Sequence, residues 1–261
     1  MNTVVPGRVP QRRIAETVAA ELRQRILVGG DFDRLPTQDQ LVREFGVSYP
    51  SVREALRILE TEGLVTVRRG SVGGAEVHRP DQSSGAYHLG LVLQGAGVTL
   101  GDLAEGLRRL EPLCAAEVAR RADRMTVVVP ALIANVDASA EAVSDGVTFT
   151  RIAREFHDLV VVFTPNDTIR HVVRSLVALW SAQEQQWAAA VSRRGEYPSA
   201  ANARAAVRTH RRLVDEIAAG RADEAERIAR SHLAATQALL LERFTDDVVN
   251  AAPARAGWGT A

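Results

Sequence analysis

The chain has 261 residues, 46% of them hydrophobic, which is enough material for two packed domains. No apolar run approaches the length of a membrane span, and the N-terminal segment lacks the apolar core of a signal peptide. We therefore expect a cytoplasmic protein without a membrane partner. Cys114 is the only cysteine, which excludes an internal disulfide and a cysteine-rich zinc site.

The formal net charge is zero, and every basic residue is an arginine. Residues 1–80 contain 12 arginines and 10 acidic residues, so this part carries +2 and the remainder −2. This balance excludes a strongly basic domain, so individual arginines would have to supply any phosphate contacts. Arginine is suited to that task because it makes paired hydrogen bonds to phosphate and to guanine.

The first predicted elements form a small N-terminal domain over residues 10–79, after a disordered arm. Residues 14–27 show an apolar stripe at helical spacing, which predicts a supporting helix. Thr37 and Gln40 have the spacing of a capping box at the start of a second helix. Gly46 permits the left-handed conformation that ends that helix. Ser48 then caps a third helix, so residues 35–63 indicate a helix, a turn and a helix.

The third helix has an outer face formed by Tyr49, Arg53 and Arg57, which recur every four residues. Residues 64–69 alternate apolar and polar side chains, and residues 75–77 can return as a second strand, which predicts a hairpin wing. A short helix, a tight turn and an arginine-bearing helix suit the major groove of DNA. The alternative is a surface helix with two solvated arginines and an ordinary hairpin, but the ordered series of signals favours DNA binding.

Residues 12–79 closely resemble the winged helix-turn-helix of the GntR family of bacterial transcription regulators. The matching pieces are Leu35-Pro36-Thr37, Val47-Ser48, Val52-Arg53-Glu54-Ala55-Leu56, Leu59-Glu60-x-Glu62-Gly63-Leu64, Arg68-Arg69-Gly70 and Gly73-Gly74. The resemblance implies double-stranded DNA as the partner and a set of candidate contact residues: Thr37, Ser48, Tyr49, Pro50, Ser51, Arg53, Arg57, Arg68, Arg69, Gly70 and Gly73.

Two positions depart from the family pattern. The family usually has an arginine where this chain has Asp39, and another where it has Tyr49. An aspartate would repel phosphates, whereas a tyrosine can still donate a hydrogen bond or stack. We therefore expect DNA binding with a base preference different from that of typical relatives.

The remainder of the chain is predicted to be helical. Residues 80–98 are polar and rich in helix breakers, which indicates a linker. Residues 99–245 then form an all-helical antiparallel bundle, and residues 246–261 a disordered tail. The fold class is therefore mainly α, with one small β-hairpin. The helices of the bundle are expected over residues 99–121, 125–143, 147–163, 166–192, 201–219 and 223–244.

Three histidines are the candidate metal ligands of the bundle. His157, His210 and His232 each share the apolar face of a different predicted helix, so each is expected to point inward. Three converging imidazoles can bind Zn²⁺ or a similar divalent cation. For each histidine alone, a hydrogen-bonded core residue is the alternative, and periodicity does not establish that the three meet.

Residues 99–244 also resemble the FCD domain, the helical effector domain of FadR-like GntR regulators. The matching pieces are Leu110-Glu111-Pro112, Phe156-His157, Asn166 and the pairing of His210 with His232. In many such domains one aspartate and three histidines bind a metal. The resemblance places His157, His210 and His232 at the histidine positions, while the aspartate position is Ala153. It thus implies a metal site that has lost a carboxylate and has a lower affinity, and an empty pocket is an alternative.

Together these observations predict a homodimeric transcription repressor that binds a pseudo-palindromic operator. A small acidic effector in the helical domain, with a divalent metal as its cofactor, would control operator affinity. Two alternatives are a metal-dependent hydrolase that uses the three histidines and an architectural DNA-binding protein without an effector. No side chain is assigned a catalytic role, because no carboxylate is placed as a general base.

Overall fold

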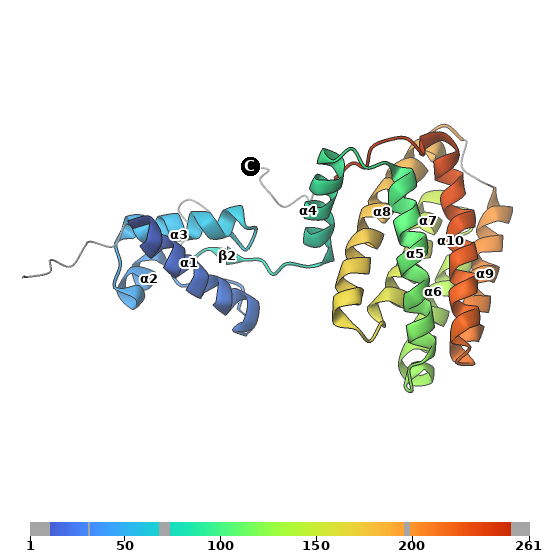
Figure 1. Cartoon of the computed structure of the whole chain (residues 1–261), viewed down its shortest axis with the longest axis horizontal. Coiled ribbons are helices and arrows are strands. Elements are labelled where there is room, and N and C mark those ends of the chain that lie inside the picture. Colours follow the sequence, from blue (N-terminus) through green and yellow to red (C-terminus); the bar gives the residue numbers. More distant parts are fainter. Residues whose placement is uncertain (1–10, 31, 68–73, 196–198, 252–261) are drawn as a thin grey trace, which may run out of the picture. The chain divides into compact units, whose positions relative to one another are not determined.

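The computed structural model describes residues 11–30, 32–67, 74–195 and 199–251, and its backbone divides into two compact units (Figure 1). The division falls between Asp81 and Gln82. The expected arm, residues 1–10, lies outside the described residues. No described helix combines the length and apolar character that a bilayer span requires.

The first unit is a three-helix domain with a short hairpin. Helices α1 (Gln11–Val28), α2 (Gln38–Phe45) and α3 (Tyr49–Thr61) precede strands β1 (Val65–Thr66) and β2 (Glu76–Val77). The strands are antiparallel, with Val65 opposite Val77, and Arg34 adds an isolated bridge to Glu76. The hydrophobic core contains side chains from all three helices and from β1. One face of α3 packs into this core, and its opposite face is exposed to solvent.

The second unit is the expected helical bundle, and one segment differs from the sequence prediction. Its helices are α4 (Gln82–Gly95), α5 (Leu100–Ala119), α6 (Val129–Glu141), α7 (Gly146–Val162), α8 (Asp167–Arg193), α9 (Ala200–Ala218) and α10 (Ala222–Phe244). Residues 125–143 are not one helix, because a π-helical turn, Arg124–Val128, precedes α6 and Pro130 lies in the first turn of that helix. Figure 1 shows α5 and α10 side by side, and these two helices share extensive contacts.

The prediction of a linker over residues 80–98 is wrong for residues 82–95, which form α4 and pack along α8. The glycines that suggested flexibility serve close packing instead. A Cβ atom at Gly85 would lie 2.5 Å from Ser175 Oγ, and one at Gly90 would lie 3.1 Å from Leu179 Cδ1. Small residues therefore let α4 approach α8, which composition alone could not indicate.

The start of the expected disordered tail is also ordered. Val249 is buried and donates its backbone N–H to Val98 O at 2.9 Å. Gln183 Nε2 donates to Asn250 O at 2.6 Å. Residues 246–251 thus belong to the helical unit, and residues 252–261 lie outside the described residues.

The close approach of α4 predicts a position-specific cost of side-chain size. Replacing Gly90 by leucine should destabilise the helical unit by about 1–3 kcal/mol, because the new side chain would have to displace Leu179 and the backbone of Ala251. Gly95→Leu in the same helix is the matched control, since a Cβ there meets nothing within 4 Å. Urea unfolding followed by the fluorescence of the α8 tryptophans measures both. Equal stability of the two variants would contradict the packing role of Gly90.

Candidate functional site

The helix-turn-helix is fixed by local hydrogen bonds that the sequence indicates. Thr37 and Gln40 form the capping box of α2, with Thr37 N–H donating to Gln40 Oε1 at 2.8 Å. Gly46 ends that helix in the left-handed region at φ 63°. The Ser48 side chain accepts the N–H of Ser51 and so caps α3. The turn therefore sets the direction of α3 relative to α2 before any DNA is present.

The outer face of α3 is exposed as predicted. Tyr49 is 48% exposed, and Arg53 and Arg57 are also exposed. Arg57 forms an ion pair with Glu54 at 2.8 Å. Tyr49 Oη donates to Asp39 Oδ1 at 3.1 Å, and this hydrogen bond raises the pKa of the tyrosine. The two residues that depart from the usual family pattern are therefore coupled, which the sequence did not reveal.

One candidate DNA contact needs correction. The Ser51 residue is only 2% exposed, and its hydroxyl lies 3.0 Å from Ser48 Oγ, so its side chain supports the cap and does not face solvent. Pro50 is exposed in the first turn of α3. The remaining candidates, Arg68, Arg69, Gly70 and Gly73, lie outside the described residues.

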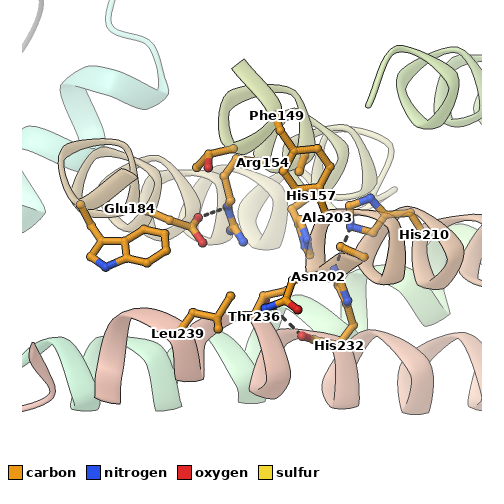
Figure 2. A pocket seen from close by; sticks show the side chains of 14 residues that line it. Phe149, Arg154, His157, Glu184, Asn202, Ala203, His210, His232, Thr236 and Leu239 are labelled. Atoms are coloured by element: carbon orange, nitrogen blue, oxygen red, sulfur yellow. Dashed lines mark hydrogen bonds and ion pairs between the residues drawn. The ribbon is translucent and has the colours of Figure 1, made fainter. Parts of the chain in front are cut away.

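The three predicted histidines converge in the helical unit (Figure 2). His157 comes from α7, His210 from α9 and His232 from α10, and all three are buried. One nitrogen of each ring lies within 4.8 Å of those of the other two. His210 Nε2 and His232 Nε2 are 2.8 Å apart, so one of them donates to the other. The inward orientation inferred from periodicity therefore corresponds to one shared site.

A buried carboxylate supports this cluster from α5. Glu111 is 3% exposed, and its Oε1 is hydrogen-bonded to Nδ1 of His157. Burial by itself would raise the pKa of Glu111, but His157 and then Arg154 outweigh it and hold that pKa below its usual value. The next residue, Pro112, has no backbone N–H to donate to the carbonyl of Arg108 one turn earlier in α5. That carbonyl instead accepts a hydrogen bond from Arg230 Nη1 at 3.0 Å.

The other two histidines are held in their neutral form. Burial lowers the pKa of His210 well below its usual value, and the nearby His232, His157 and Arg154 lower it further. The pKa of His232 is lowered in the same way, first by burial and then by His157 and Arg154. Neutral imidazoles retain a lone pair that a metal can accept, and they need no proton loss to bind it.

Arg154 and Glu184 are site residues to which the sequence analysis assigned no role. Arg154 is 5% exposed, and its Nε lies 3.1 Å from Oε2 of the buried Glu184 of α8. Its Nη2 is 4.0 Å from Glu111 Oε2. In the sequence Arg154, like Arg151 and Arg174, could attract an acidic effector, but a solvated arginine is commoner, so none of the three was assigned to the site.

The cluster opens into a cavity of about 80 Å³. Ala153, Arg154 and the three histidines line it, together with Trp187 from α8 and Thr236 and Leu239 from α10. In Figure 2 Arg154 extends from α7 into the space between Glu184 and His157. Ala153, at the position where the family resemblance would place an aspartate, lines the same cavity as the three histidines.

The residues present fit a divalent metal, with one opposing feature. Three buried imidazoles form an appropriate donor set, and the hydrogen bond from His157 to Glu111 orients that ring, as is usual for metal-bound histidine. The opposing feature is Arg154, whose positive charge disfavours further positive charge on His210 and His232. The site is therefore competent for a metal but electrostatically less favourable than one with an aspartate.

A helix-turn-helix with a small two-stranded sheet, followed by a helical domain that contains a cavity, is the arrangement of a class of DNA-binding regulators. The model for bacterial regulatory proteins of the gntR family matches residues 13–73, and the FCD domain model matches residues 102–235. The chain therefore belongs to the GntR family, in the group that carries an FCD domain. The resemblance found in the sequence is confirmed for both parts.

Several curated relatives are transcription regulators. The HTH-type transcriptional repressor NanR of Salmonella newport is 28% identical over 160 residues, or 60% of each chain. The Uxu operon regulator of Haemophilus influenzae is 30% identical over 175 residues, or 67% of this chain and 58% of the relative. NanR of Klebsiella aerogenes is 40% identical over 72 residues, or 27% of each chain. The chain thus spans between 27% and 60% of the length of these relatives.

A solved structure shares the fold. Streptococcus agalactiae GntR superposes with a TM-score of 0.59 over 87% of this chain and 98% of that chain, at 19% identity. At this identity the likeness concerns the fold alone. The hydrolase alternative has no support from these comparisons, because the relatives named here are regulators.

Proposed function

We propose that this protein is a transcription repressor whose affinity for its operator is controlled by a small acidic effector, with a divalent metal at the three histidines. The convergence of His157, His210 and His232 on a cavity carries the effector proposal. The family supports the DNA-binding part. The repressor names of two relatives favour repression over activation.

The DNA contacts in this proposal come from α3, its preceding turn and the wing. Tyr49, Arg53 and Arg57 face the major groove, and Thr37, Ser48 and Pro50 lie at the helix starts. The wing supplies Arg68, Arg69, Gly70 and Gly73. A homodimer presents two such units to the half-sites of a pseudo-palindromic operator.

The first prediction from this proposal concerns Arg53. Once an operator has been selected from random DNA, Arg53→Ala should weaken its binding by about 1–3 kcal/mol, because a direct contact to a base or phosphate is lost. Arg109→Ala is the control, since it removes the same charge from an exposed arginine of α5. Fluorescence anisotropy measures both affinities. Wild-type affinity in a folded Arg53→Ala protein would remove Arg53 from the interface.

The second prediction concerns base preference. Because the Tyr49 hydroxyl donates a hydrogen bond to Asp39, its oxygen is left as an acceptor, which suits the amino groups of adenine and cytosine in the major groove. Tyr49→Arg should shift the selected operator toward guanine, because an arginine presents only donors. Selection from random DNA with wild type, Tyr49→Arg and Tyr49→Phe tests this. An unchanged consensus in the arginine variant would mean that Tyr49 does not contribute to sequence preference.

The third prediction concerns the metal. His210→Ala should weaken Zn²⁺ binding at least about tenfold, because one of three nitrogen donors is lost. Ala153→Asp should tighten it, because an anionic oxygen returns to the cavity beside Arg154. The same variant should weaken an effector that binds through a carboxylate to the metal. Isothermal titration calorimetry measures these affinities.

His171→Ala is the matched control for the metal prediction, since His171 is exposed on α8. It should bind Zn²⁺ as wild type does. If His210→Ala also binds Zn²⁺ with wild-type affinity, the three histidines are core residues and not a metal site.

A further inference from the structure

Arg154 is a buried cation with unused hydrogen-bonding capacity. Among the described residues, its Nε, Nη1 and Nη2 atoms have no hydrogen-bond partner. Its contact with Glu184 at 3.1 Å is an ion pair without hydrogen-bond geometry, and Glu111 is 4.0 Å away. A guanidinium normally directs five donors into a planar fork, so this one can accept a further anionic partner.

The two nearby carboxylates do not remove that capacity. Glu111 binds His157 through Oε1, and its Oε2 lies 4.0 Å from Arg154 Nη2, too far for a hydrogen bond. Burial raises the pKa of Glu184, and its contact with Arg154 lacks hydrogen-bond geometry, so the Arg154 donors stay unused. A buried charge without satisfied donors costs several kcal/mol in a protein interior, so an anion that supplied the missing hydrogen bonds would be bound favourably.

We propose that Arg154 forms an anion-binding subsite, separate from the three histidines, which holds the carboxylate of a short organic acid without requiring a metal. This inference rests on the proposed function, since it identifies how the acidic effector is held. Arg154 forks toward the two carboxylate oxygens, and the rest of the acid lies in the cavity. The resemblance of the three histidines to the metal ligands of related domains does not by itself imply this arginine subsite.

The cavity limits the size and character of the acid. Its volume of about 80 Å³ holds roughly five to eight water-sized groups at about 10–15 Å³ each. Phe149, Ala206 and Leu239 give part of its lining an apolar surface, while Asn202 and Thr236 are polar. The geometry therefore fits a carboxylate on a short chain, and a long fatty acid would not be enclosed.

The subsite also links acid binding to metal binding. Arg154 lines the same cavity as His210 and His232, so its positive charge disfavours a cation bound there. A carboxylate on Arg154 would offset that charge, so acid and Zn²⁺ should each strengthen the binding of the other by the same factor. In Arg154→Gln this mutual effect should disappear.

The test uses the full-length protein treated with chelator and titrated with butyrate, with the neutral butyramide as a matched ligand. Trp187 lines the cavity, so its fluorescence reports binding, and calorimetry confirms it. Wild type should bind butyrate at least about tenfold more tightly than butyramide, because only the acid forms a charge-assisted pair. Arg154→Gln should lose butyrate affinity by about ten- to a hundredfold.

Arg151→Gln is the matched control, because Arg151 lies about one turn before Arg154 on α7 but is exposed and pairs with Glu155. It should bind butyrate as wild type does. Arg154→Lys keeps the buried charge but loses the fork, and it should bind with intermediate affinity. If Arg154→Gln does not fold, Arg154→Lys still tests whether the guanidinium is needed for butyrate binding. The comparison of butyrate with butyramide is made on wild type and does not depend on any variant.

Two outcomes would overturn the inference: equal binding of butyrate and butyramide by metal-free wild type, or unchanged butyrate affinity in folded Arg154 variants. Operator binding measured in parallel distinguishes failure of the arginine subsite from failure of the proposed function. If short acids release DNA equally well from wild type and Arg154→Gln, the regulator stands and the subsite fails. If butyrate needs Arg154 but no short acid changes operator affinity, the subsite stands and the proposed control fails.

Discussion

The helical unit depends on burying four ionisable groups together. Glu111 on α5, Arg154 and His157 on α7, and Glu184 on α8 approach one another away from solvent. Each charge is tolerable only because the others are present, and removing one partner of a buried pair typically costs about 3–5 kcal/mol. The network therefore fixes the relative positions of three helices around the cavity, and the ligand chemistry of the cavity is set by the same groups.

The balance of charge within this network determines what the cavity favours. With alanine at position 153, no carboxylate from α7 faces the three histidines, while Arg154 remains beside them. Cation binding is thereby made less favourable and anion binding more so. The site therefore brings three imidazoles and one buried guanidinium to the same cavity.

The packing of α8 suggests how a ligand can affect other parts of the unit. Glu184 contacts Arg154 from α8, and α8 packs along α4, where Gly85 and Gly90 allow close approach. The chain enters α4 directly from the end of the DNA-binding unit at Asp81. Under the proposed function, an anion that draws Arg154 away from Glu184 would act on the helix against which α4 packs. Such coupling requires that the ligand bind one arrangement of these helices better than another.

The sequence by itself determined the features that depend on neighbouring residues in the chain. The capping box of Thr37, the left-handed Gly46 and the inward faces of His157, His210 and His232 all follow from local spacing, and the structure contains each. Tertiary structure alone decided the rest. The glycines of α4 became packing surfaces because α8 lies against them, and Val249 became buried because the start of α5 receives it. Arg154 and Glu184 became site residues for the same reason: a charged side chain on a helix is solvated by default, and only partners brought from other helices make its burial favourable.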